Sequence, residues 1–159
     1  MLNNLASELS IVQSLAPATD AAGRTGKYVS LKNAVGAWIL VQVNQGDANT
    51  VLISPKQAEA VAGTNVKVLA NAVQIWVNSD TANTANFTRQ TDAVNYTTTA
   101  ATTPKAVLFK VAPNALDSVN GFDCLTVVTG ASNVGNITSS VIMIDNKYKG
   151  EPPVSVIAD

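Results

Sequence analysis

Alternation of apolar and polar side chains dominates the middle of the chain and limits the folds open to it. Apolar residues fall at every second position of residues 37–44, and residues 73–78 repeat the pattern. A period of two places successive side chains on opposite faces of a β-strand. Further short apolar runs predict strands at residues 28–31, 50–53, 87–94, 106–111, 125–129 and 140–144, with 50–53 as the hairpin partner of 37–44 across a turn at residues 45–47.

Short, turn-forming connections separate these predicted strands and set the fold class. Gly, Asn, Asp and Ser recur between them, whereas no helix of crossover length alternates with them. This pattern is typical of an antiparallel sheet and argues against a parallel one. We therefore expect a mainly β protein, an antiparallel β-sandwich or barrel with one or two short helices and extended N- and C-terminal arms.

The predicted helices and one ambiguous segment lie between the strands. Ser54 and Pro55 resemble an N-cap and a first helical position, which predicts a helical turn up to residue 61 that Gly63 ends. Residues 113–119 predict a second helical turn. Residues 95–103 are nearly all Thr and Ala, and they fit either an edge strand or an exposed loop.

Both ends of the chain are predicted to be arms, giving an N-terminal arm at 1–26, a β body at 27–148 and a C-terminal arm at 149–159. The leucines and valine from Leu2 to Leu15 recur at steps of three and four, which predicts a short helix ended by Pro17. The prolines near residue 152 cannot donate to a ladder and lead to an apolar tip. The N-terminal helix could pack on its own domain or dock on a neighbouring subunit.

Composition favours a protein that works inside an assembly. Of the 159 residues 47% are hydrophobic but only 13% are charged, about half the usual share. Trp76 falls on the polar side of its strand, so it is either an interface anchor or packed under a loop. The candidate residues for contact with another subunit or protein are Leu5, Leu9, Val12, Leu15, Trp76, Val154, Val156 and Ile157.

Several function classes lack their usual residues. The chain has no histidine, hence no common general base or metal ligand, and only one cysteine. Ten basic and eleven acidic residues are scattered without the basic cluster that nucleic acid requires. No apolar run reaches the roughly 18 residues of a membrane span, and no signal-peptide pattern opens the chain. We expect neither an enzyme, a nucleic-acid binder nor a membrane protein.

Two motifs that could bind ligands fail on inspection. Residues 23–27 (Gly-Arg-Thr-Gly-Lys) resemble a phosphate-binding loop, but Ala21 replaces its first glycine and Tyr28 its magnesium-binding hydroxyl. The oxygen-bearing pairs near Asp47 and Asp80 have too few ligands for calcium. The sequence therefore predicts no catalytic residue, no cofactor and no metal.

The chain also resembles a known family. The distinctive strings occupy residues 14–26, 57–64, 89–94, 120–124 and 129–138. They are similar to small structural proteins of tailed bacteriophages. This resemblance implies a capsid decoration, or cement, protein that binds the outside of the expanded shell. The implied partners are the major capsid protein and further copies of the chain, as a dimer or trimer. The implied location is the capsid surface of the virion, after synthesis in the cytoplasm of the host bacterium.

Two other readings stay open at this point. The chain could serve another virion role, as a head fibre base, a neck protein or a tail component. It could also be a carbohydrate-binding module, since β-sandwiches often hold sugar sites and Trp76 could stack on a sugar ring.

Overall fold

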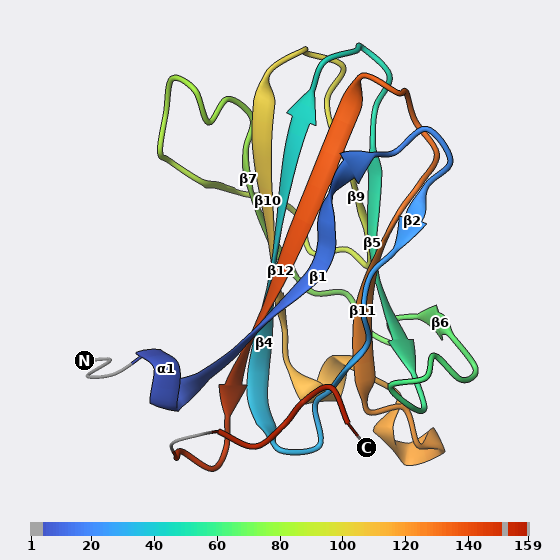
Figure 1. Cartoon of the computed structure of the whole chain (residues 1–159), viewed down its shortest axis with the longest axis vertical. Helices are drawn as coiled ribbons and strands as arrows, with labels where there is room; N and C mark the ends of the chain where they lie inside the picture. The colour runs from blue at the N-terminus through green and yellow to red at the C-terminus, as the bar shows by residue number, and fades with distance from the viewer. Residues whose placement is uncertain (1–4, 151–152, 159) are drawn as a thin grey trace.

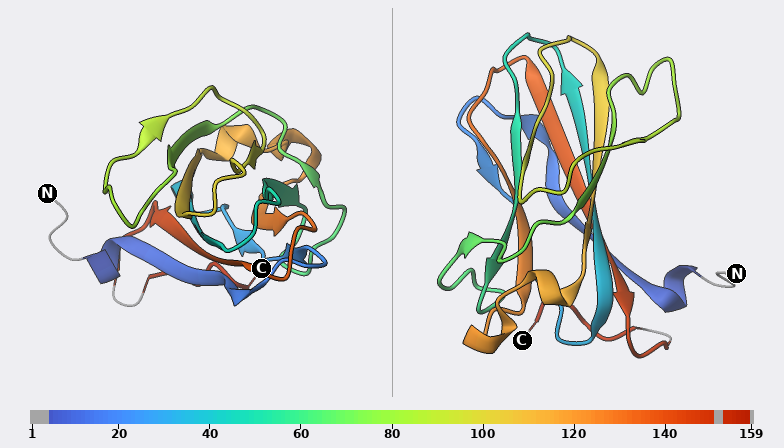
Figure 2. Two further views of the ribbon diagram at one scale, coloured as in Figure 1. Left: turned by 90° about the horizontal axis from the view of Figure 1, so that it is seen from above. Right: turned by 180° about the vertical axis from the view of Figure 1, so that it is seen from behind.

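The alternating runs form two antiparallel β-sheets that face each other in a computed structural model, which describes residues 5–150 and 153–158 (Figure 1). The arrangement is a sandwich and not a closed barrel, so the predicted mainly β class is confirmed and its two alternatives are resolved. Figure 2 shows the two layers from above and from behind.

Sheet A contains six strands and most of the long ones. Their order across the sheet is β1 (Leu9–Thr19), β12 (Asn136–Asn146), β4 (Ala34–Gln45), β10 (Pro104–Val111), β7 (Gln74–Asn78) and β8 (Thr88–Arg89). The predicted strands at 37–44, 73–78, 106–111 and 140–144 all lie here.

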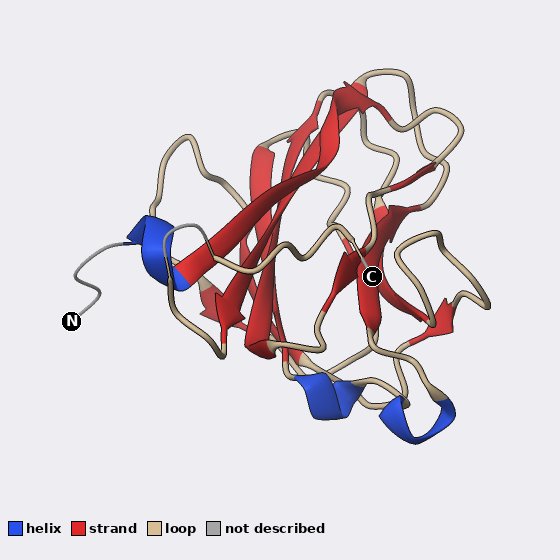
Figure 3. Ribbon diagram, turned by 60° about the horizontal axis from the view of Figure 1, so that its bottom comes forward, coloured by secondary structure: helices blue, strands red, loops and turns tan. Residues whose placement is uncertain are grey.

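Sheet B is built from shorter strands. The main order is β2 (Arg24–Thr25), β11 (Cys124–Thr129), β5 (Leu52–Ala58) and β6 (Lys67–Val68); β3 (Val29–Ser30) also pairs with β11, and β9 (Tyr96–Thr97) with β5. The remaining elements are α1 (Leu5–Glu8) and the 3-10 helices η1 (Pro113–Ala115) and η2 (Ser118–Asn120). Both 3-10 helices lie at one end of the sandwich, where a helical turn was predicted (Figure 3).

The inner faces of the two sheets form one hydrophobic core. Ile39 and Phe109 come from sheet A, whereas Ile53, Leu125 and Val127 come from sheet B, and all five are fully buried. Burying a side chain of this size contributes about 1.5–3 kcal/mol. The alternation seen in the sequence is therefore the alternation between this core and the outside.

The predicted N-terminal helix is wrong. Of the described residues before Pro17, only residues 5–8 are helical, and residues 9–19 form the edge strand β1 on β12. A register shift between Gln13 and Leu15 explains why helical spacing misleads here, since a bulge lets Val12 and Leu15, three positions apart, both face the core. The segment predicted as an arm thus supplies a strand of sheet A and, through β2, one of sheet B.

The predicted helical turn at residues 54–61 is also wrong, because residues 52–58 form strand β5. One side of β5 pairs with β11 along its length. On the other side, β9 pairs with residues 52–53 and β6 with residues 56–57. Pro55 falls in the gap between these two partners, where its missing N–H costs no ladder bond.

Two predicted strand boundaries are corrected as well. The predicted hairpin of residues 37–44 with 50–53 does not form, because β4 lies in sheet A and β5 in sheet B. The predicted strand at 87–94 shrinks to the two residues of β8. Residues 95–103 contain only the two-residue β9 and are otherwise loop.

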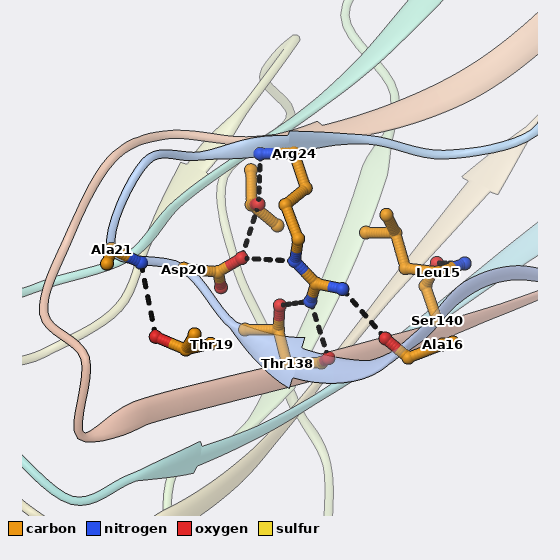
Figure 4. A network of polar contacts seen from close by, with 9 residues as sticks. Leu15, Ala16, Thr19, Asp20, Ala21, Arg24, Thr138 and Ser140 are labelled. Carbon is orange, nitrogen blue, oxygen red and sulfur yellow. Dashed lines mark hydrogen bonds and ion pairs between the residues drawn. The ribbon is translucent and has the colours of Figure 1, made fainter.

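A polar network joins the two sheets where the chain passes from β1 to β2 (Figure 4). Asp20 is fully buried and accepts bonds from Arg24 Nε at 3.0 Å and from the Thr129 hydroxyl at 2.7 Å. The same guanidinium donates to the carbonyl oxygens of Ala16 at 2.7 Å and Thr138 at 2.6 Å. The Gly-Arg-Thr-Gly-Lys motif therefore has a structural role, because its arginine donates hydrogen bonds to residues of β1, β12 and the β1–β2 connection.

Candidate protein-interaction surface

The outward side chains of sheet A form a continuous apolar surface. The register places Met143 of β12 beside Trp38 of β4, with Ile11 of β1 next to Met143. In the adjoining row, Leu108 of β10 lies between Leu40 and Trp76. We call this surface the apolar face; it consists of Ile11, Trp38, Leu40, Trp76, Leu108, Val141 and Met143.

The members of the apolar face shield one another only in part. Ile11 is 54% exposed, and the others are half-buried. Five of the seven residues lie on the three adjacent inner strands β12, β4 and β10, which support the surface from below (Figure 1). A rigid apolar surface of this kind is characteristic of protein contact sites.

Two tryptophans and two cations run diagonally across this face. The rings of Trp38 and Trp76 lie 5.8 Å apart between centroids at 42°. The Arg89 guanidinium lies 4.9 Å from the centre of the Trp76 ring, and Lys110 Nζ lies 5.3 Å from that of Trp38. Each such cation–ring contact contributes about 0.5–1 kcal/mol at an exposed site. The tryptophans are thereby held in fixed orientations.

A groove borders the apolar face on the side of the long loop between β7 and β8. Its volume is about 560 Å³, and Leu40, Ala106 and Phe87 line it together with loop residues 81–85. The loop projects from the body beside β7 and β10 (Figure 1). Asn78 donates its amide N–H to the Thr84 carbonyl at 2.7 Å, which ties the loop to the sheet.

The rest of the described chain offers little for other chemistry. Within residues 5–150 and 153–158, no group of three His, Cys, Asp or Glu side chains is arranged to hold a metal, and no helix is long and apolar enough to cross a membrane. Burial lowers the pKa of Lys105, whose ammonium donates to the carbonyl oxygen of Thr103 at 3.1 Å. Cys124 is buried. These groups fit structural roles.

The predicted contact residues are distributed over four parts of the molecule. Trp76 lies on the apolar face, and Leu9 lies on the same side of β1 as Ile11. Val12, Leu15 and Val156 instead pack in the protein's own core. Val154 and Ile157 are exposed, whereas Leu5 lies in α1 and its side chain is outside the described set. A contact between either arm and another subunit stays a prediction.

The C-terminal tail reaches the body near β3. The carbonyl of Val156 accepts a bond from the Ser30 N–H at 2.7 Å. Val156, in the predicted apolar tip, is therefore buried against the core of its own chain.

Sequence reasoning missed most of the apolar face. Trp38 and Leu40 could have indicated it, because both are apolar at positions where the alternation of their strand predicts outward, polar side chains. Leu108, Val141 and Met143 repeat that signal in β10 and β12. Only the strand order, which places these three strands side by side, turns separate residues into one surface.

Comparisons with known proteins add a distant likeness. No family model matches the sequence, and no curated protein matches it either. Among solved structures, the crystal structure of the SPBc2 prophage-derived protein YomS is similar over 86% of this chain and 93% of that chain. The identity is 9% and the TM-score 0.46, values at which the likeness carries no argument about function.

Proposed function

We propose that this chain is a non-enzymatic capsid decoration protein of a tailed bacteriophage, and that it binds the major capsid protein through the apolar face. The apolar face of sheet A is the observation that supports this proposal. The family resemblance of the sequence and its low share of charged residues point in the same direction.

The binding mechanism follows from the rigidity of that face. Trp38 and Trp76 act as anchors, because large aromatic side chains held in place lose little conformational freedom on binding. Lys110 has no carboxylate within ion-pair distance among the described residues, so it is available to an acidic group at the rim of the partner surface. Many modest contacts on a repeating shell then give high avidity.

Co-sedimentation with shells that lack the protein tests the proposal, using both immature and expanded shells. We expect saturable binding of many copies per shell to the expanded form. Trp76→Ala should weaken binding about 30-fold, the effect of losing a typical hot-spot residue. Val68→Ala is the matched control, since Val68 is 56% exposed on sheet B.

Two outcomes would overturn the proposal. The first is a folded protein that binds neither shell form. The second is equal binding by the Trp76 variant and the wild type. A few copies per particle in place of many would indicate a neck, fibre or tail role.

The groove beside Phe87 supports a second candidate, a carbohydrate-binding module. Gln42 and Asn78 line it, and amides beside an aromatic ring are the groups that recognise sugars. Against this candidate, Arg89 and Lys110 already cover ring faces of the two tryptophans. A glycan-binding screen decides the matter: binding lost in Phe87→Ala favours the carbohydrate function.

A further inference from the structure

The two edges of sheet A differ in how they are protected. One edge is β8, which has only two residues and carries Arg89. The other is β1, eleven residues long and without a single charged side chain. Edge strands of soluble proteins are normally short, charged, bulged or covered, because an open edge can pair with another chain.

The second half of β1 has such protection. Register shifts interrupt its pairing after Gln13 and again after Leu15, and Pro17 follows. Its outer edge is also covered, since Lys27 N–H donates to the Ser14 carbonyl at 3.1 Å and Arg24 donates to the Ala16 carbonyl. Residues 14–19 are therefore unsuited to pairing with another strand.

The first half of β1 has none of these protections. Residues 9–13 pair in regular register with residues 141–145 of β12 on one side. On the other side, no backbone hydrogen bond joins residues 9–13 to any other described residue. This segment also borders the apolar face, because Ile11 lies beside Met143. An added strand here would extend that face.

We propose that residues 9–13 pair antiparallel with the same residues of a second copy of the chain, about a two-fold axis at Ile11. Such an arrangement is self-complementary: Ile11 faces its counterpart, and Leu9 of each copy faces Gln13 of the other. No like charges are opposed, because the segment has no charge. Outward residues stay outward, so two six-stranded sheets join into one with their apolar faces side by side.

This inference stands apart from shell binding. Dimer formation is measured with the purified protein alone, so its result does not depend on the outcome of the shell-binding assay. Sedimentation equilibrium of the full chain over a range of concentrations should reveal a dimer. Ile11→Lys opposes two ammonium groups across the axis and should raise the dissociation constant at least about tenfold. Val68→Lys, at equal exposure on the other sheet, should leave the dissociation constant unchanged.

Cysteine cross-linking tests the register. Directly opposed residues of an antiparallel pair have Cα atoms about 4.5–5.5 Å apart, within disulfide range. Ile11→Cys should therefore give a covalent dimer on mild oxidation, whereas Gln13→Cys and Val68→Cys should not. Cys124 is buried and should not contribute. A wild type that is monomeric at all concentrations, a dimer insensitive to Ile11→Lys, or cross-linking at Gln13 in place of Ile11 would overturn the proposal.

Discussion

The outer faces of the two sheets are made from different residues, although their inner faces are alike. Outward from sheet B point Thr25, Ser54 and Lys56, with Val128 between Thr25 and Ser54. Outward from sheet A point tryptophans, leucines and a methionine. An antiparallel sheet can present a mainly polar face to water, as sheet B does apart from Val128 and the exposed Leu52 and Val68. The apolar face of sheet A is thus not a requirement of the fold, which supports the proposed binding role.

Core substitutions on the inner faces of the two sheets should lower the free energy of unfolding by similar amounts, and these are the largest effects that we expect. Phe109→Ala in sheet A and Leu125→Ala in sheet B each leave a cavity in the shared core. We expect each to lower the free energy of unfolding by about 3–4 kcal/mol, measured by urea denaturation. Ser54→Ala is the control, within about 0.5 kcal/mol of wild type. A tolerated change at either core position would mean that the two layers are not one core.

The polar network of Asp20 and Arg24, which joins the two sheets, should give the next largest effect on stability. Arg24→Met leaves the carboxylate of Asp20 buried without its cation and should cost about 3 kcal/mol of unfolding free energy. Adding Asp20→Asn to Arg24→Met should recover part of the loss, because it removes the unpaired charge. The same urea measurement applies. If the double variant is as unstable as the sum of the two single variants, the two residues are not coupled.

The outer faces should differ by a smaller amount. Trp76→Ala removes a half-buried ring together with its contacts to Trp38 and Arg89, and we expect a loss of about 2 kcal/mol of unfolding free energy. Val68→Ala on sheet B should change it by less than about 0.5 kcal/mol. Equal losses of unfolding free energy for the two variants would contradict the proposed difference between the two outer faces.

The smallest effect concerns acid stability near the edge of sheet B. Hydrogen bonds from Lys67 and then Asn120 lower the pKa of Asp117 below its ordinary value. Because the folded-state pKa is the lower one, the carboxylate adds stability above the ordinary pKa and loses it as pH falls through the folded-state pKa. Asp117→Asn should flatten thermal stability against pH in that acidic range alone. An unchanged pH profile would contradict this assignment.

Much of the fold could be predicted from the sequence, because side chains along β4, β7, β10 and β12 largely alternate between the core and the outside. The failures have local physical causes. The bulge after Gln13 gave β1 the spacing of a helix, and a gap between two partner strands let Pro55 sit within β5. Neither feature can be read from residue spacing, since both depend on which strands become neighbours.

The candidate surface was predicted only at Trp76. Its other members come from β1, β4, β10 and β12, which are distant in sequence. Leu15 and Val156 were predicted as contact residues on the assumption that the chain ends extend outward. The structure places both in the core, because the ends fold back onto the body.

The position of β12 between β1 and β4 has a consequence for how the protein is made. The strand nearest the C-terminus is the neighbour that both β4 and the N-terminal strand require. During synthesis, residues 9–19 have no place in sheet A until residues 136–146 have left the ribosome. Contacts of such high sequence separation form slowly, over milliseconds to seconds in comparable β-sandwiches. Sheet A therefore cannot be completed until the last of its strands has been synthesised.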